Sequence, residues 1–215
     1  IVRGRGVIRD HGARRKMLRM EENTSSISTR TTDGELIVRG VPLRDLIAGA
    51  SFAEAVCVLL RGDRPDTNTR LLLDAILIAI CEHGDEPPST TATRVSATSG
   101  NALHVAVAAG VLGMGPRHGC AIEGAMRLFA SAEDPNAVIA RERQAGRRIP
   151  GFGHRLYADE DPRTRALFAR AEELGRSGGS VNRARIFEHA LAEVTGRHLP
   201  LNVDGAIAAL LVDLG

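Results

Sequence analysis

Signals that start α-helices recur along this chain, and they constrain its fold more than any other feature. Ser51 and Glu54 form a capping-box pattern ahead of the apolar run "AVCVLL", and Gly62 follows that run as a helix terminator. Asp134-Pro135 and Asp161-Pro162 each place a capping residue before a proline at the first helical position. The chain is therefore predicted to be mainly helical.

The spacing of apolar residues predicts further helices, and only one segment is typical of a strand. The expected helices are "RLLLDAILIAI" (70–80), ending near His83-Gly84, "ALHVAVAAGVLG" (102–113), opened by Asn101, "NRARIFEHALAEVTG" (182–196) and "DGAIAALLVDLG" (204–215). The expected strand is "GELIVRGV" (34–41), and "PPSTTATR" (87–94) is interpreted as a polar connector. The absence of a βαβ rhythm and of a glycine-rich nucleotide loop after a strand argues against a dinucleotide-binding fold.

Composition places the chain among globular proteins. Hydrophobic residues make up 43% of the sequence, and no apolar run approaches the ~20 residues that a bilayer requires. We therefore expect a cytoplasmic protein without a membrane partner. The three cysteines, Cys57, Cys81 and Cys120, lie in apolar helical patterns and are expected to be buried reduced thiols.

The net charge of +2 gives no overall attraction to nucleic acid, although arginines crowd the first twenty residues. This basic arm is expected to be a solvated or subunit-contacting segment. Nucleic acid is therefore not an expected partner.

His118 is a candidate for stabilising negative charge during a reaction. It precedes the helical pattern "AIEGAMRLF", and the positive end of a helix dipole disfavours an imidazolium. A neutral ring there can donate one N–H to a developing oxyanion. A core histidine that hydrogen bonds to the backbone is the alternative interpretation.

His154 and Arg163 form a second candidate pair. His154 follows the glycine-rich "GFG", and Arg163 lies in the first helical turn after Asp161. Together they can grip a carboxylate and an adjacent carbonyl, although a glycine turn with a surface arginine would give the same pattern. His83, expected at a helix C-terminus, is more often a partner of the helix dipole than a ligand.

Asp204 has apolar neighbours at a predicted helix start in "LNVDGAIAALL". Burial there would raise its pKa and suit it to act as a base toward a carbon acid. A plain helix N-cap is an equally valid interpretation. The histidines without such a setting are interpreted as structural or surface residues (His11, His104, His189 and His198).

In order and spacing, "RHGCAIEG", "PGFGHRLYADEDPR" and "LNVDGAIAALL" resemble the citrate synthase superfamily, and the resemblance covers about residues 30 to 215. It implies an all-α fold in which a large helical domain (1–118 and 204–215) and a smaller one (119–203) close over the substrates. It also implies a homodimer or higher homo-oligomer, with no permanently bound cofactor and no metal.

Carried over position by position, the resemblance assigns His118 to the enolate oxygen of acetyl-CoA, Asp204 to the methyl proton, and His154 to the oxaloacetate carbonyl. His83 and Arg163 would bind oxaloacetate. The coenzyme A contacts would come from the loop before and around His154 (Arg148, Ile149, Gly151, Phe152, Gly153 and Arg155). Ala158 stands where the family often has a basic residue, so phosphate binding is expected to depend on Arg148 or Arg155.

The short chain and the non-aromatic "GAIAALL" after Asp204 are more similar to the citryl-CoA lyase branch, which cleaves citryl-CoA to acetyl-CoA and oxaloacetate. Citrate or 2-methylcitrate synthase is the alternative, followed by a non-catalytic CoA- or nucleic-acid-binding protein. A metal site with two or three histidines and a carboxylate, drawn from His83, His118, His154 and Asp204, is a weaker alternative, because no paired-histidine motif supports it.

Overall fold

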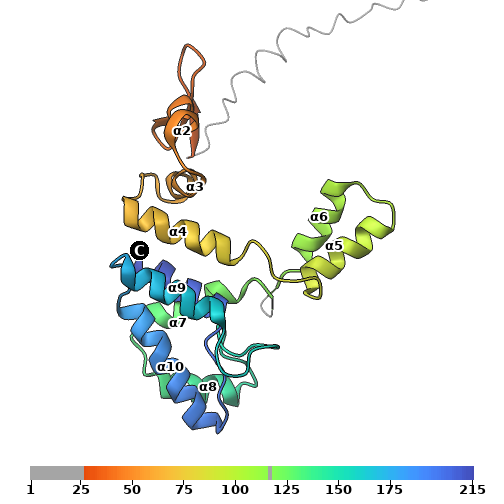
Figure 1. The fold of residues 1–215 in the computed structure, drawn as a ribbon, viewed down its shortest axis with the longest axis vertical. Coiled ribbons are helices and arrows are strands. Elements are labelled where there is room, and N and C mark those ends of the chain that lie inside the picture. Colours follow the sequence, from red (N-terminus) through yellow and green to blue (C-terminus); the bar gives the residue numbers. More distant parts are fainter. Residues whose placement is uncertain (1–26, 116–117) are drawn as a thin grey trace, which may run out of the picture. The chain divides into compact units, whose positions relative to one another are not determined.

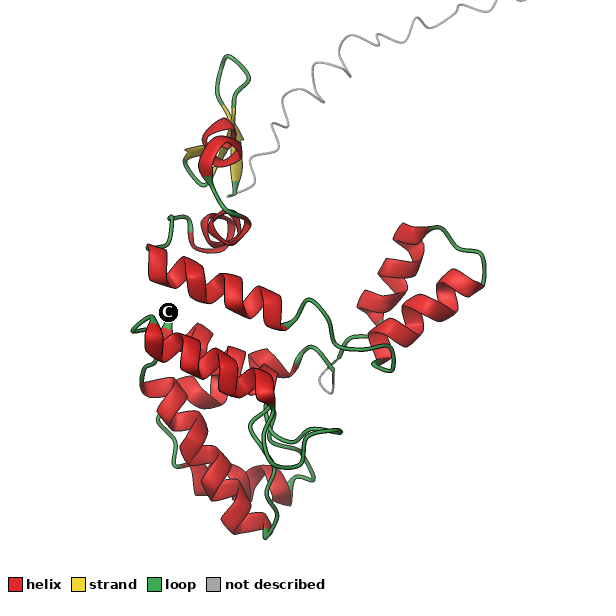
Figure 2. Ribbon diagram, in the orientation of Figure 1, coloured by secondary structure: helices red, strands yellow, loops and turns green. Residues whose placement is uncertain are grey.

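Helices predominate in the computed structural model, which describes residues 27–115 and 118–215 (Figure 1). Contacts divide the chain into two units, Ile1–Pro65 and Asp66–Gly215. The strands lie in the first unit, and the described part of the second unit is built from helices and loops (Figure 2). The all-α prediction is therefore confirmed for the unit that carries the candidate site, whereas the basic arm at residues 3–19 lies outside the described residues.

The first unit contains a small antiparallel sheet with the order β1 (Ser28–Arg30), β2 (Leu36–Val38), β3 (Val41–Pro42). Val38 pairs with Val41, so only Arg39 and Gly40 form the turn between β2 and β3. Both turn residues have positive φ, 49° and 81°, as a tight hairpin turn requires. The strand expected over residues 34–41 is thus two short strands joined by this turn.

The described part of the first unit also contains the helices α2 (Leu43–Gly49) and α3 (Phe52–Arg61). The Ser51–Glu54 capping box is present in both directions, and Gly62 ends α3 in the left-handed region, as predicted. Val38, Leu46 and Val58 form a small core that joins the sheet to the two helices.

The second unit is a helical assembly around α11 (Val203–Asp213). Its other helices are α4 (Thr67–Ala79), α5 (Pro88–Thr98), α6 (Leu103–Leu112), α7 (Ala121–Ala130), α8 (Pro135–Gln144), α9 (Pro162–Glu173) and α10 (Gly179–Thr195). Helix α11 contacts α7, α9 and α10, and it is buried at every position from 205 to 210. A helix that is apolar on all sides is stable only inside a core, which explains the central place of "GAIAALL".

Helices α5 and α6 form an antiparallel hairpin (Figure 1). The interpretation of residues 87–94 as a polar connector is wrong, because α5 begins at Pro88. Gly110 of α6 approaches α5 so closely that a Cβ atom there would lie 2.1 Å from Thr93 Oγ1. Asn101 does not cap α6, since the N-cap is Ala102 and the Asn101 amide donates to Ser96.

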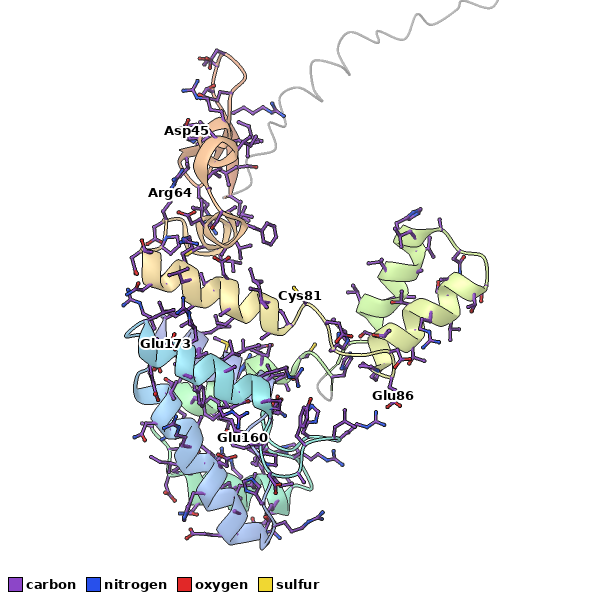
Figure 3. The ribbon with its side chains drawn as sticks, in the orientation of Figure 1. Asp45, Arg64, Cys81, Glu86, Glu160 and Glu173 are labelled. Atoms are coloured by element: carbon purple, nitrogen blue, oxygen red, sulfur yellow. The ribbon has the colours of Figure 1, made fainter. Side chains whose placement is uncertain are left out.

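Two other expectations need correction. Cys57 is buried as predicted, but Cys81 and Cys120 are exposed, because Cys81 follows the end of α4 and Cys120 precedes α7 (Figure 3 labels Cys81). Helix α4 ends at Ala79, which leaves His83 in the following loop.

None of the helices in the described ranges combines the length and the apolar character that a membrane span requires. The predicted domain boundaries at 118/119 and 203/204 stay a prediction.

Candidate active site

The loop that carries His154 lies against the segment that leads into α11. Gly153 N–H donates to Pro200 O (2.7 Å), Asn202 N–H donates to Gly151 O (3.0 Å), and Phe152 and Leu201 form an antiparallel bridge. Segments about fifty residues apart in sequence are therefore joined like two short strands. This seam brings the His154 loop next to the first turn of α11.

Two glycines make the seam possible. Gly151 has a φ of +87°, and a Cβ atom there would lie 2.9 Å from Gly205 Cα. A Cβ atom on Gly205 would lie 2.5 Å from Gly151 O. The backbones meet directly, so a side chain at either position would force them apart.

Asp204 lies in the first turn of α11, and the N-cap of this helix is Asn202. The interpretation of Asp204 as a plain N-cap is therefore wrong. Burial raises the pKa of Asp204 above its ordinary value, as predicted, and the nearby Asp161 carboxylate adds to the rise. Arg163 and the His118 and His154 rings interact with Asp204 electrostatically in the opposite sense.

Asp161 and Arg163 form a largely enclosed ion pair at the start of α9. Asp161 is 0% exposed, and its carboxylate accepts hydrogen bonds from Arg163 N, Nε and Nη2 and from Val203 N. Burial would raise the pKa of Asp161, but the hydrogen bonds from Arg163 outweigh this effect and hold the pKa below its ordinary value. The buried carboxylate thus ties the start of α9 to the start of α11.

Two sets of N–H donors surround the His154 ring. Nδ1 lies 3.1 and 3.2 Å from the backbone nitrogens of Leu156 and Tyr157, and Nε2 lies 3.2 Å from Arg163 Nη2. A neutral imidazole has one unprotonated nitrogen, so it accepts from one set at a time. Burial lowers the pKa of His154, which favours this neutral ring over the imidazolium.

His118 and His83 share one serine hydroxyl. Ser89 Oγ lies 2.8 Å from His118 Nε2 and 3.2 Å from His83 Nε2, and the two rings stack with centroids 5.6 Å apart. A hydroxyl can donate to one ring and accept from the other, so Ser89 couples their tautomers. The structure thus brings together two of the predicted histidines through a residue that the sequence did not single out.

The residues expected to bind coenzyme A divide into two groups. Ile149 is buried in the core, so its backbone is the part that can face a ligand, and Phe152 is partly buried with its ring against Phe129. Arg148 and Arg155 are exposed. Arg155 lies 3.7 Å from Glu86, which Figure 3 labels in the loop before α5, and such an exposed pair is weak enough to yield to a phosphate.

Ser89, Asp161 and Asn202 are the site residues that sequence reasoning missed. Asp161 and Asn202 had local signals, since each precedes a helix, but a capping pattern does not reveal a second partner. Ser89 lies in the segment interpreted as a connector, so no signal pointed to it. A separate cavity of about 640 Å³ between α9 and α10 contains none of the predicted site residues.

No group of three or more histidine, cysteine, aspartate or glutamate side chains in the described part of the chain is arranged to hold a metal ion. The candidate site contains proton-transferring and hydrogen-bonding groups. These are Asp204, His118 with Ser89, and His154 with Arg163.

Comparison with known proteins identifies the family of this chain. Residues 61–215 match the family described as "Citrate synthase, C-terminal domain". The solved citryl-CoA lyase of Hydrogenobacter thermophilus superposes with a TM-score of 0.81 at 37% identity, covering 89% of this chain and 76% of that one.

Curated relatives are longer proteins. ATP-citrate synthase subunit 1 of Sordaria macrospora is 30% identical over 201 residues, 87% of this chain but 29% of the relative. Putative citrate synthase 2 of Mycobacterium tuberculosis is 34% identical over 137 residues, 62% of this chain and 36% of the relative. The chain thus spans about a third of their length. From the matched domain and the similarity to the lyase, we conclude that this chain belongs to the citrate synthase family.

Proposed function

We propose that this chain cleaves citryl-CoA to acetyl-CoA and oxaloacetate. The observation that carries the proposal is the seam that brings the His154 loop to the first turn of α11, where the half-buried carboxyl of Asp204 lies close enough to His154 and His118 to interact with them electrostatically. A base, an acid and an oxyanion donor are the groups that breaking a carbon–carbon bond next to a thioester requires. The similarity to the citryl-CoA lyase supports this direction of the reaction.

His154 starts the cleavage by removing the proton of the citryl hydroxyl group. The ring nitrogen that takes this proton must be unprotonated and must exchange its present donor for the hydroxyl group: Arg163 Nη2 at Nε2, or the Leu156 and Tyr157 N–H groups at Nδ1. As the hydroxyl becomes a carbonyl, the bond between its carbon and the methylene group of the thioester breaks. The electron pair moves into the thioester carbonyl and forms the enolate of acetyl-CoA.

His118 stabilises that enolate. If the Ser89 hydroxyl donates to His118 Nε2, the ring carries its proton on Nδ1 and presents Nδ1–H to the enolate oxygen. His83 completes this arrangement, because its Nε2–H can donate to the same hydroxyl oxygen. Protonated Asp204 then delivers its proton to the methylene carbon, and its raised pKa favours this protonated form.

Arg163 would hold one carboxylate of the oxaloacetate portion, and His83 would hold the other through Nδ1–H when both of its ring nitrogens carry protons, since Nε2–H faces Ser89. Arg163 uses Nε and Nη2 on Asp161, so Nη1 is the nitrogen directed to substrate. The backbone of residues 149–153, with Arg148 and Arg155, would face coenzyme A. The thioester itself accepts the electron pair, so the reaction requires no permanently bound cofactor.

The exposed apolar residues of helix α6 support self-association, in which the partner is a second copy of this chain. Ala106 and Gly110 are buried, whereas Leu103, Val107 and Val111 are 80%, 49% and 59% exposed. A helix this apolar on all sides requires a partner over more than one face. We propose that the α5–α6 hairpin forms a homo-oligomer interface.

Condensation of acetyl-CoA with oxaloacetate, the citrate synthase reaction, is the alternative, because the same groups act in reverse. The relative named putative citrate synthase 2 supports it, whereas the small aliphatic residues after Asp204 favour the lyase. The test is to incubate the chain with citryl-CoA, and separately with acetyl-CoA and oxaloacetate, and to identify the products by mass. Asp204→Asn is the matched control, and absence of product in both incubations would refute the proposal.

A further inference from the structure

We propose that Asn202 is a positioning residue that fixes His154 relative to Asp204. The inference rests on the proposed function for its kinetic consequence, but the contact it describes exists in the fold independently of any reaction. Asn202 precedes α11 and meets the His154 loop with both its backbone and its side chain.

The Asn202 amide is bound at both ends. Its Oδ1 accepts from Gly205 N (3.1 Å), which caps the helix that carries Asp204, and its Nδ2 donates to Gly153 O (2.9 Å) in the loop next to His154. The oxygen of the amide faces an N–H donor and its nitrogen faces a carbonyl acceptor. If the amide were flipped, Oδ1 would face the Gly153 carbonyl oxygen and Nδ2 would face the Gly205 N–H, and both hydrogen bonds would be lost. One planar group therefore spans the two catalytic elements.

The Asn202 backbone adds a third hydrogen bond, which also joins the start of α11 to the His154 loop. Its N–H donates to Gly151 O (3.0 Å), so Asn202 binds the carbonyls of both glycines that flank Phe152. No other residue type has a short side chain that both caps a helix and donates an N–H at this reach. Serine or aspartate would cap α11 equally well but would leave Gly153 O without its donor.

The rest of the segment around Asn202 is held by other helices. Leu201 N donates to Glu188 of α10 (2.7 Å), Thr164 Oγ1 of α9 donates to Leu201 O (3.0 Å), and Val203 N donates to Asp161 (3.0 Å). The anchor for Asn202 is therefore rigid. Its side-chain bond to Gly153 transmits that rigidity to the loop, whose own residues 155–160 are exposed.

Asn202→Ser is the decisive variant, because serine keeps the helix cap and removes the amide donor. Amide hydrogen exchange should become about 5-fold faster at Gly153 and in the loop at Leu156 and Tyr157, the scale of one lost hydrogen bond. Turnover of citryl-CoA should fall about 10-fold, with KM changed less than about 2-fold, since the lost contact orients groups rather than binds substrate. Asn101→Ser, which removes an exposed amide bond to Ser96, is the matched control and should change neither.

Unchanged exchange at Gly153 in folded Asn202→Ser would overturn the proposal, and so would faster exchange with unchanged turnover. Asn202→Asp provides a second test, because it also keeps the cap and opposes a carboxylate oxygen to Gly153 O. If the wild-type chain does not act on citryl-CoA in either direction, the proposed function is refuted. In that case the exchange rates still decide whether Asn202 holds the loop.

Discussion

Replacing Asp161 with alanine should destabilise the helical unit far more than removal of an ordinary helix cap. The carboxylate is completely buried and accepts four N–H groups, three from Arg163 and one from Val203. Alanine fills the space near the backbone but leaves every one of these donors without its acceptor. The start of α9 and the start of α11 would lose their shared anchor.

The magnitude follows from what each donor loses. The lost helix cap costs about 1 kcal/mol, and the buried Val203 N–H without a partner costs about 1 to 2 kcal/mol. Breaking a buried ion pair costs about 3 to 5 kcal/mol, but Arg163 is 28% exposed and can be partly rehydrated, so we expect a total of about 3 to 4 kcal/mol. In a chain of this size that corresponds to a fall in Tm of about 10 °C.

Thermal unfolding followed by circular dichroism measures this loss, and the chain supplies its own control. Asp134 starts α8 with the same Asp-Pro pattern, but it is exposed, and within the described part of the chain its carboxylate accepts only from Ala137 N (3.0 Å). Asp134→Ala should therefore lower Tm by about 2 to 3 °C. Equal losses in the two variants would refute the view of Asp161 as a buried anchor.

The pH dependence of the same variant has a definite sign. The folded pKa of Asp161 lies below its unfolded value of about 3.9, so its stabilising effect is complete above that pH and is lost as pH falls through the folded pKa. The difference in the free energy of unfolding between wild type and Asp161→Ala should be constant from about pH 6 to 8 and shrink below about pH 4. A difference that grows in acid would contradict this assignment.

Four further predictions address the site and the interface. Asp204→Asn should nearly abolish deuterium exchange at the acetyl-CoA methyl group while CoA binding persists, and unchanged exchange would exclude Asp204 as the base. His118→Ala should lower turnover by about 10²-fold or more, the scale of a lost oxyanion donor, and near-normal turnover would make it a structural histidine. Arg163→Lys should weaken oxaloacetate binding by about 1.5 to 3 kcal/mol in calorimetric titration, with CoA affinity retained, because an ammonium lacks the planar fork whose separate nitrogens meet Asp161 and the substrate carboxylate, and equal oxaloacetate affinity would exclude Arg163 as a substrate ligand. Val107→Glu on α6 should convert the oligomer to a 22.9 kDa monomer in light scattering, and a wild type already monomeric would contradict the proposed interface.

Local chemistry made much of the fold predictable from the sequence. The starts of α3, α8 and α9 follow from Ser51, Asp134 and Asp161, because a cap and the helix it begins are adjacent in the chain. The apolar run of α11 likewise predicted a helix without reference to any other segment. These features depend on residues within a few positions of one another.

Helix α5 could not be predicted in the same way. Its sequence, "PSTTATRVSAT", is rich in residues with low helix propensity, and its N-cap, Pro87, makes no side-chain cap. What stabilises it is the close approach of α6 at Gly110, and Thr93 Oγ1 donates to Ser89 O within the helix. Packing against α6 therefore outweighs the low helix propensity of α5. The residues 87–94 taken alone show only that low propensity, and for this reason they indicate a connector.

The residues that orient the candidate site could not be predicted from local sequence either. Sequence patterns identified residues that can transfer protons, because an aspartate in an apolar setting or a histidine after glycines is unusual by itself. The groups that orient them are ordinary serine, aspartate and asparagine residues, and their partners lie 29 residues away for Ser89 with His118 and 49 for Asn202 with Gly153. Only the fold supplies those partners. If Asp204 is the base, as proposed, its raised pKa is useful only when its neighbours are held in place, so the residues that hold them are expected to contribute to the mechanism as well.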